Sequence, residues 1–303
     1  MRGRLKAGVE TAIVRSGLAG VLRRRLRSRS LVLAYHGVTP QGERPAGELA
    51  LHLPEAQFIA QLEVLGEFTK VVPLSDLLCS LESGSQRPRV AISWDDAYVG
   101  ALTAGVDAVV RRGFPATIFV APGRLGGQSF WWDRLAERFA GTIPGAIRAR
   151  ALQGLAGVDE GIAVEYEGDA PPASIPDFAR TAGATLLTAV AARPGISVAS
   201  HSWSHVNLAA VPPERLEQEL TSSAHWLTER FRSYLPCLAY PYGLHSPLVR
   251  RRAAAAGYRA GFRVEGGWMP RQDEERFALP RFNVPAGLSL DGFVLRLSGL
   301  LSH

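Results

Sequence analysis

The chain contains little cysteine: its 303 residues include only Cys79 and Cys237. Two cysteines are too few for the disulfide framework that holds small secreted domains together. No apolar run approaches the roughly 18 residues of a membrane-spanning helix. The basic N-terminus also lacks the compact apolar run and small-residue cleavage site of a secretory signal. We therefore expect a cytoplasmic protein in which both cysteines are buried thiols.

Acidic residues are rare at one end of the chain, where the positive charge collects. The net charge is +6, and residues 1–30 carry nine basic side chains against the single acid Glu10. The other 273 residues carry 25 basic and 27 acidic side chains. This near-neutral body excludes a protein that wraps nucleic acid. The apolar fraction of 47% and the charged fraction of 20% also exclude disordered, collagen-like and coiled-coil chains.

The basic segment has apolar residues at roughly helical spacing, with arginines between them. We therefore expect residues 1–30 to form a basic amphipathic N-terminal helix. Such a helix can lie on the inner face of an anionic membrane, where each Lys or Arg contributes about 1 kcal/mol. The alternative is a helix that is solvated or docked on the protein, and the sequence leaves both open.

From residue 31 onward, short apolar runs alternate with segments of helical pattern. The runs cover 31–35, 70–74, 89–94, 116–121, 196–200, 237–240 and 258–263, and the expected helices cover 54–66, 75–83, 101–112, 179–192, 213–232 and 247–256. This alternation predicts an α/β fold with a parallel sheet covered on both faces, either a barrel or an open sheet. Residues 122–178 break the rhythm, and we interpret them as an insertion with one helix near 133–139 within a single domain, 31–303.

Reactive side chains follow directly after these apolar runs. They are His36, Asp95, Asp96, His201, His205, Pro241, Tyr242 and Gly243. In an α/β barrel the carboxyl ends of the strands form one rim, and active sites lie at that rim. Four distant segments would then converge on one mouth, which favours an enzyme.

The two histidines of His201-Ser-Trp-Ser-His205 are four residues apart. On a helical turn this spacing would place both rings on one face, as two ligands of a metal require. A carboxylate from the Asp95-Asp96 pair would complete a set of two histidines and one acid, which is typical of a catalytic Zn²⁺. The alternatives are a hydrogen-bonded histidine pair and exposed loop aspartates.

Other candidates stand alone in the sequence. His36 could be functional or simply lie at a solvated strand end. Arg281 could pair with the carboxylates and keep them ionised, or be a surface arginine. Trp131 and Trp132 open the expected helix of the insertion, where they could stack on sugar rings or pack in the core.

Three segments together resemble the polysaccharide deacetylases, the NodB-homology or carbohydrate esterase family 4 group. They are Ser93-Trp94-Asp95-Asp96-Ala97, the His201–His205 segment and Tyr240-Pro241-Tyr242-Gly243, and the likeness covers about residues 31–285. The resemblance implies a distorted (β/α)7 barrel and hydrolysis of N-acetyl groups on amino sugars of a polysaccharide or glycan precursor. It implies that Asp96, His201 and His205 hold a divalent metal, with Zn²⁺ expected and Co²⁺ or Ni²⁺ as alternatives.

The resemblance also implies roles for the other residues of the site. Asp95 is expected as general base, and the Tyr242 backbone N–H as a donor to the oxyanion. Leu33-Ala34-Tyr35-His36 and Leu279-Pro280-Arg281 are similar to segments of the subgroup that acts on poly-N-acetylglucosamine, which makes His36 the expected acid. Substrate contacts are expected from Trp94, Trp132, Trp203 and Pro241.

Two substitutions depart from the family pattern: Ala97 replaces the usual glycine, and Ala239 replaces a common arginine. They keep open a non-catalytic carbohydrate-binding protein on the same barrel. A second alternative is removal of another acyl or a formyl group from a small or lipid-linked sugar.

The charge asymmetry generates a first prediction. Deleting residues 1–29 should move the protein from the membrane fraction to the supernatant while deacetylation is retained, because the expected site lies wholly in the near-neutral body. Fractionation of cells that express either form measures this. An unchanged distribution would rule out the membrane-surface helix.

Overall fold

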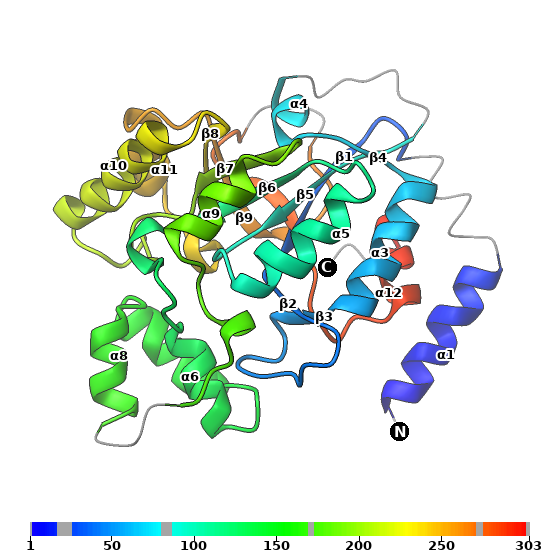
Figure 1. The fold of residues 1–303 in the computed structure, drawn as a ribbon, viewed down its shortest axis with the longest axis horizontal. Coiled ribbons are helices and arrows are strands. Elements are labelled where there is room, and N and C mark those ends of the chain that lie inside the picture. Colours follow the sequence, from blue (N-terminus) through cyan, green and yellow to red (C-terminus); the bar gives the residue numbers. More distant parts are fainter. Residues whose placement is uncertain (1, 17–25, 80–86, 169–172, 271–274, 301–303) are drawn as a thin grey trace.

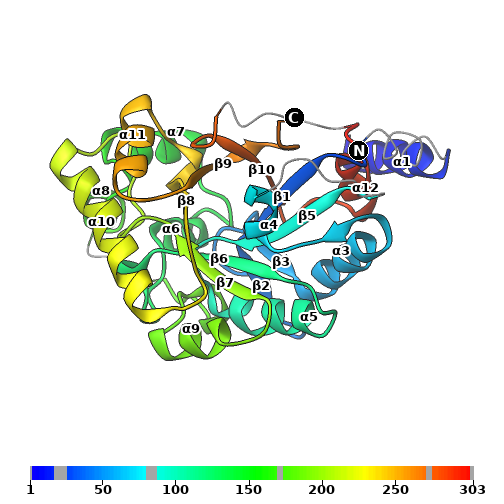
Figure 2. The ribbon, with the colours of Figure 1, turned by 90° about the horizontal axis from the view of Figure 1, so that it is seen from above.

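In the computed structural model of the chain, seven parallel strands close into a barrel (Figures 1 and 2). The structure describes residues 2–16, 26–79, 87–168, 173–270 and 275–300. The ring runs β1-β10-β9-β8-β7-β6-β5 and closes by pairing β1 with β5. Its strands are β1 (Ser30–Tyr35), β5 (Arg89–Trp94), β6 (Ala116–Val120), β7 (Ile196–Ser200), β8 (Tyr234–Ala239), β9 (Ala260–Gly266) and β10 (Leu279–Asn283). The expected (β/α)7 barrel is therefore confirmed.

The strands are apolar on both faces because each face packs against protein. In β1, Val32 points into the barrel, where it joins Phe119 and Phe262. Its neighbours Leu31 and Leu33 pack into the layer between strands and helices. Successive side chains of a strand alternate between faces, so an uninterrupted apolar run supplies both layers of the core.

Helices cover the outside of the barrel, as Figure 1 shows. They include α3 (Glu55–Phe68), α4 (Leu74–Cys79), the π-helical turn η1 (Ala101–Gly105) with α5 (Val106–Val110), α9 (Ala184–Ala191), α10 (Pro213–Arg230), α11 (Pro247–Ala255) and α12 (Leu290–Leu297). Pro213 and Pro247 each occupy the first turn of their helix, where a missing N–H costs little. A small second sheet pairs β2 (Gly37–Thr39) with β3 (His52–Pro54).

The insertion forms a helical lobe beside the mouth of the barrel (Figure 1). It contains more helix than expected: η2 (Pro122–Arg124), α6 (Trp131–Arg138), α7 (Gly145–Ala149), η3 (Arg150–Gly154), α8 (Asp159–Tyr166) and η4 (Asp177–Ala179). Arg134 joins α6 to α8 through hydrogen bonds to Asp159 and Glu167. Two acidic residues of this segment, Asp159 and Glu167, are thus paired with an arginine within the lobe.

The N-terminal helix is α1 (Arg2–Arg15), and it packs against α12 (Figure 1). Thr11 donates a hydrogen bond to Asp291, and Ser289 donates one to the buried Glu10. The docked alternative is thus observed over this stretch, whereas residues 17–25 lie outside the described residues. Membrane contact by residues 1–29 stays a prediction. Within the described ranges, no helix is both long and apolar enough to cross a bilayer.

Several local expectations were wrong. The run 70–74 forms only the short strand β4 (Lys70–Val71), which pairs with the start of β5. The seventh strand of the ring is instead β10, which contains Pro280 and a fully buried Arg281 and so did not look like a strand. Pro280 is tolerated because the register with β9 shifts at that point. Cys79 is exposed rather than buried.

Gly100 provides a test of how the barrel loops pack. A Cβ on this residue would lie 2.0 Å from the Val38 carbonyl oxygen of β2. Gly100→Ala should therefore destabilise the protein by roughly 1–3 kcal/mol, although alanine normally favours a helical residue. Urea denaturation measures this, with Gly183→Ala as the control, since a Cβ there meets no atom within 4 Å. Equal stabilities of the two variants would refute the close approach.

Candidate active site

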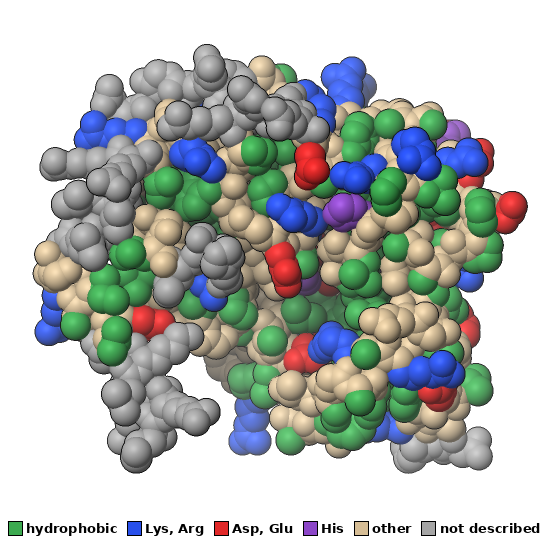
Figure 3. Space-filling model, turned by 180° about the vertical axis from the view of Figure 1, so that it is seen from behind, with side chains coloured by type: hydrophobic (Ala, Val, Ile, Leu, Met, Phe, Trp, Pro, Cys, Tyr) green, Lys and Arg blue, Asp and Glu red, His purple; other side chains and the backbone are tan. Residues whose placement is uncertain are grey.

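The carboxyl ends of the strands surround a cavity of about 210 Å³. Figure 3 shows the molecule hollowed between the barrel and the helical lobe, with charged side chains bordering the hollow. The cavity is lined by His36, Leu51, Asp95, Asp96, Trp132, Arg148, Leu152, His201, His205, Tyr240, Tyr242, Gly243, Val264 and Asn283. Segments that are far apart in the sequence therefore meet at one mouth, as expected for a barrel.

Asp96, His201 and His205 form a buried cluster in this cavity. The two Nε2 atoms are 3.1 Å apart, and Asp96 Oδ1 lies 3.1 Å from His205 Nε2 and 3.7 Å from His201 Nε2. Ligand atoms around a tetrahedral zinc ion lie roughly 3.3 Å apart, given bonds of about 2.0–2.2 Å. The buried Asp96 Oδ1 has no hydrogen-bond partner among the described residues. The three side chains therefore fit a single divalent ion.

The orientation of His201 is set by the backbone of β8. Its Nδ1 lies 2.7 Å from the Ala239 carbonyl oxygen, which can only accept a hydrogen bond. The ring proton must therefore reside on Nδ1, which leaves the Nε2 lone pair for a metal. His205 is instead held by aromatic rings: Phe130, Trp132 and Tyr242 lie 5.4, 4.8 and 4.7 Å from its centre.

The two histidines are not on a helical turn, contrary to the expectation from their spacing. The segment from His201 to His205 is a loop in which Ser202 and His205 have left-handed backbone, with φ of 64° and 61°. Asp96 and Ala97 are also left-handed, with φ of 71° and 53°. Such conformations cost roughly 1–3 kcal/mol each and collect at functional sites. Ala97 thus adopts a conformation that glycine would adopt more readily.

Asp95 makes a buried ion pair with Arg281. Both carboxylate oxygens accept hydrogen bonds of 2.7 Å from the guanidinium, which is fully buried. Burial by itself raises the pKa of Asp95, but the charges of Arg281 and His201 outweigh it and hold that pKa well below its usual range. Asp95 is therefore ionised at every physiological pH, and Arg281 is not a surface arginine.

The neighbouring Asp96 has the opposite electrostatics. Burial raises its pKa to about 6, and the nearby Asp95 adds to this effect, although His201 and His36 oppose it. No arginine contacts this carboxylate among the described residues. The two adjacent aspartates thus differ. Arg281 compensates the charge of Asp95, whereas no described arginine compensates that of Asp96.

His36 follows β1 and lies close to Asp95. Its Nε2 is 3.9 Å from Asp95 Oδ2. Burial lowers the pKa of His36, while Asp95 and Asp96 oppose this shift. The imidazole is therefore mainly neutral at neutral pH.

Tyr242 and Trp132 cover the cluster from the side of the insertion. Trp131 Nε1 donates to the Tyr242 hydroxyl at 3.0 Å, and Trp132 Nε1 donates to the Tyr98 hydroxyl at 2.8 Å. Tyr98 in turn donates to the buried Asp133, which also bonds His52 at 2.9 Å. No sequence pattern indicated this network, because its members are isolated in the chain.

The structure places the remaining expected substrate residues differently. Trp132 lines the cavity, although only 3% of its surface is exposed. Trp94 is fully buried against Phe58 in the outer core, so its expected contact with substrate was wrong. Trp203 and Pro241 do not line the cavity. Arg148 and Leu152 of the insertion do line it, and the sequence pattern did not indicate them.

A family model described as polysaccharide deacetylase matches residues 83–261. The chain belongs to the polysaccharide deacetylase family. Among curated proteins it is 29% identical over 102 residues to YxkH of Bacillus subtilis, which bears the name of a polysaccharide deacetylase. That match covers 34% of this chain and 36% of YxkH, so the chain aligns with only about a third of its relative.

Solved structures of deacetylases share the fold. The deacetylase PplD of Streptococcus pyogenes, in complex with acetate, has a TM-score of 0.62 at 15% identity and covers 89% of this chain and 98% of its own. IcaB of Ammonifex degensii has a TM-score of 0.60 at 14% identity, with coverage of 91% and 97%. The BpsB deacetylase domain of Bordetella bronchiseptica has a TM-score of 0.55 at 16% identity, with coverage of 84% and 96%. At these identities the likeness establishes the barrel.

The electrostatics of Asp96 generate a prediction. Its pKa of about 6 in the folded protein exceeds the usual value of about 4, so folding favours the protonated form. The stability of the metal-free protein therefore falls as pH rises through that interval. Asp96→Asn should abolish metal binding yet stabilise the metal-free protein at pH 8 by roughly 2 kcal/mol, and by less at pH 5.

Elemental analysis and urea denaturation of chelator-treated protein measure these two effects. Asp107→Asn serves as the control, since Asp107 is a half-exposed partner of Arg193 on α5 and does not line the cavity. A loss of metal-free stability in Asp96→Asn at pH 8 would contradict the assignment of an uncompensated buried charge.

Proposed function

We propose that the protein is a divalent-metal-dependent N-deacetylase that releases acetate from amino sugars of a polysaccharide or glycan precursor. The observation that carries this proposal is the juxtaposition, in one cavity, of a metal-fitting Asp96–His201–His205 cluster with an ionised Asp95 and His36. Zn²⁺ is the proposed ion, because two imidazoles and one carboxylate are typical ligands of catalytic zinc. When bound, such an ion polarises a carbonyl and lowers the pKa of water.

Asp95 is the proposed general base. Arg281 holds its carboxylate ionised and fixes its plane through two hydrogen bonds. Hydrolysis of an amide requires removal of a proton from the attacking water, and a positioned carboxylate can accept it. The low pKa of Asp95 makes it a weak base, so its contribution rests on position more than on basicity.

His36 is the proposed acid for the leaving nitrogen. Because its pKa is lowered by burial, it is mainly neutral before reaction and must gain its proton within the cycle. Asp95 lies 3.9 Å away and is a nearby source of the proton taken from water. Protonation of the nitrogen then lets the free amine leave. The Tyr242 backbone N–H is the proposed donor to the oxyanion, an interaction worth roughly 3–4 kcal/mol.

Two further observations support this function. The structurally similar PplD was solved in complex with acetate, which is a product of the proposed reaction. The substitutions at Ala97 and Ala239 do not remove a ligand: Ala97 lies beside the cluster in the required left-handed backbone, and Ala239 orients His201 through its carbonyl oxygen. They therefore give little weight to a non-catalytic carbohydrate-binding role. His36 follows β1, as in the subgroup that the chain resembles and that acts on poly-N-acetylglucosamine, so an N-acetylglucosamine unit is the proposed reacting sugar.

The base assignment is tested with Asp95→Asn. This change should lower acetate release from N-acetylated oligosaccharides by about 10³-fold or more, in the range of general-base catalysis with positioning, while bound zinc is unchanged. The measurements are acetate release, metal content and the circular dichroism spectrum, which checks that the unpaired Arg281 has not unfolded the protein. Turnover near the wild-type rate would eliminate Asp95 as the base.

A further inference from the structure

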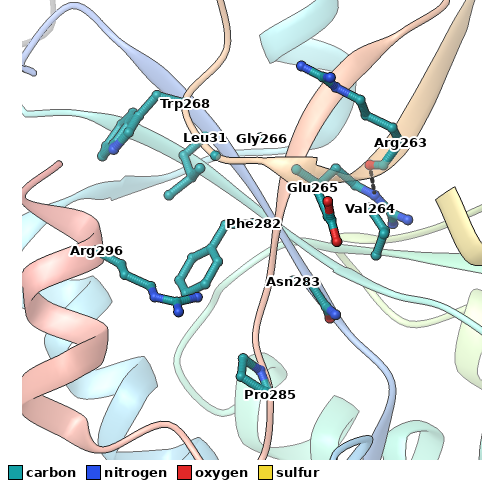
Figure 4. A pocket seen from close by; sticks show the side chains of 12 residues that line it. Leu31, Arg263, Val264, Glu265, Gly266, Trp268, Phe282, Asn283, Pro285 and Arg296 are labelled. Carbon is teal, nitrogen blue, oxygen red and sulfur yellow. Dashed lines mark hydrogen bonds between the residues drawn. The ribbon is translucent and has the colours of Figure 1, made fainter. Parts of the chain in front are cut away.

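A second and larger pocket, of about 480 Å³, lies at the seam between β9 and β10 (Figure 4). The register between these strands shifts from Leu279 opposite Phe262 to Arg281 opposite Gly266, so β9 has extra residues there. Such a bulge interrupts the ladder and bends the strand. Its lining includes Arg263, Glu265, Trp268, Phe282 and Arg296.

This pocket adjoins the reaction cavity. Val264 and Asn283 line both of them. Arg281 also connects the two, because its Nε donates to the Arg263 carbonyl oxygen while its other nitrogens hold Asp95. A glycan with one sugar in the 210 Å³ cavity would therefore direct its neighbouring unit toward the seam.

Two side chains that line the second pocket carry a donor that lacks an acceptor. The Nε of Arg296 and the Nε1 of Trp268 are buried without a hydrogen-bond partner among the described residues. The Arg296 guanidinium stacks 5.0 Å from the centre of the Phe282 ring, which fixes it on one wall (Figure 4). Buried donors without partners are rare and call for an acceptor.

The charge of the lining favours an anion. The lining includes three arginines, Arg263, Arg281 and Arg296, and a single acid, Glu265, and the charge of Arg281 is already compensated by Asp95. In Figure 4 Glu265 lies beside Val264 and apart from Arg296, and its carboxylate can accept hydrogen bonds from sugar hydroxyls. Trp268 and Phe282 add aromatic surface, which suits a sugar ring.

We propose that this pocket binds an acidic sugar unit, one that carries a carboxylate or phosphate, linked to the N-acetylated sugar in the reaction cavity. The proposal rests on the proposed deacetylase function, because that function places the linked N-acetylated sugar in the reaction cavity. The anion is held by Arg296, with Trp268 as a second donor, and the pocket makes the enzyme selective for anionic glycans over neutral ones.

The test compares three ligands: a disaccharide of N-acetylglucosamine and glucuronic acid, N-acetylglucosamine 1-phosphate, and neutral diacetylchitobiose. Calorimetric titration of the zinc-loaded full chain should show at least tenfold tighter binding of one or both acidic ligands. Whichever acidic ligand binds more tightly shows whether the pocket recognises a carboxylate or a phosphate. Acetate release from the same compounds should show the same order in kcat/KM.

Two variants assign the preference to the pocket. Arg296→Gln keeps a polar side chain but removes the charged guanidinium, and Trp268→Phe keeps a ring but removes the N–H. Arg296→Gln should lower the preference for acidic ligands about tenfold or more, and Trp268→Phe should lower it severalfold. The affinity for diacetylchitobiose should stay unchanged in both variants. Arg230→Gln is the control, because Arg230 also stacks on an aromatic ring, 4.7 Å from that of Trp226, but on α10.

Binding and turnover separate the two proposals. Preferential binding of acidic ligands without acetate release would overturn the deacetylase function and retain the anionic site. Acetate release with equal affinity for acidic and neutral ligands, or a preference unchanged in both variants, would overturn the anionic site and retain the deacetylase.

Discussion

The buried ion pair between Asp95 and Arg281 is the interaction on which the site depends. It joins the end of β5 to β10, and its two hydrogen bonds of 2.7 Å fix the plane of the carboxylate. Charges removed from water are costly unless they are paired with good geometry. Each partner therefore requires the other: Asp95 makes a buried arginine tolerable inside the barrel, and Arg281 keeps a buried carboxylate ionised.

The contrast between Asp95 and Asp96 follows from that pair. Both carboxylates are buried, but Arg281 compensates only one of them, which leaves the pKa of Asp96 raised to about 6. An uncompensated acid beside two neutral imidazoles is a poor arrangement for stability and a good one for a divalent cation. The metal-free site is thus electrostatically incomplete, and the proposed zinc ion supplies the missing charge.

The loops at the mouth add conformational strain to this electrostatic cost. Asp96, Ala97, Ser202, His205 and Tyr242 all have positive φ, and they belong to the three segments that carry the candidate chemistry. The surrounding structure must hold them in place. The helical lobe contributes to this, because Trp131 and Trp132 donate hydrogen bonds to Tyr242 and Tyr98, and Trp132 also packs against the ring of His205. The insertion therefore supports the site as well as lining it.

The sequence by itself determined an α/β fold with a buried parallel sheet, because buried parallel strands read as apolar runs, and it placed the reactive residues after those runs. Its resemblance to the polysaccharide deacetylases implied the barrel and the cluster of Asp96, His201 and His205. It missed β10, whose Pro280 and Arg281 disguise a strand, and it mistook the loop of His201–His205 for a helical turn. Only the tertiary structure decided that Arg281 pairs with Asp95, that Trp132 reaches the cavity and that a pocket lies between β9 and β10. These outcomes depend on contacts between residues far apart in the chain, and a local pattern carries no information about such contacts.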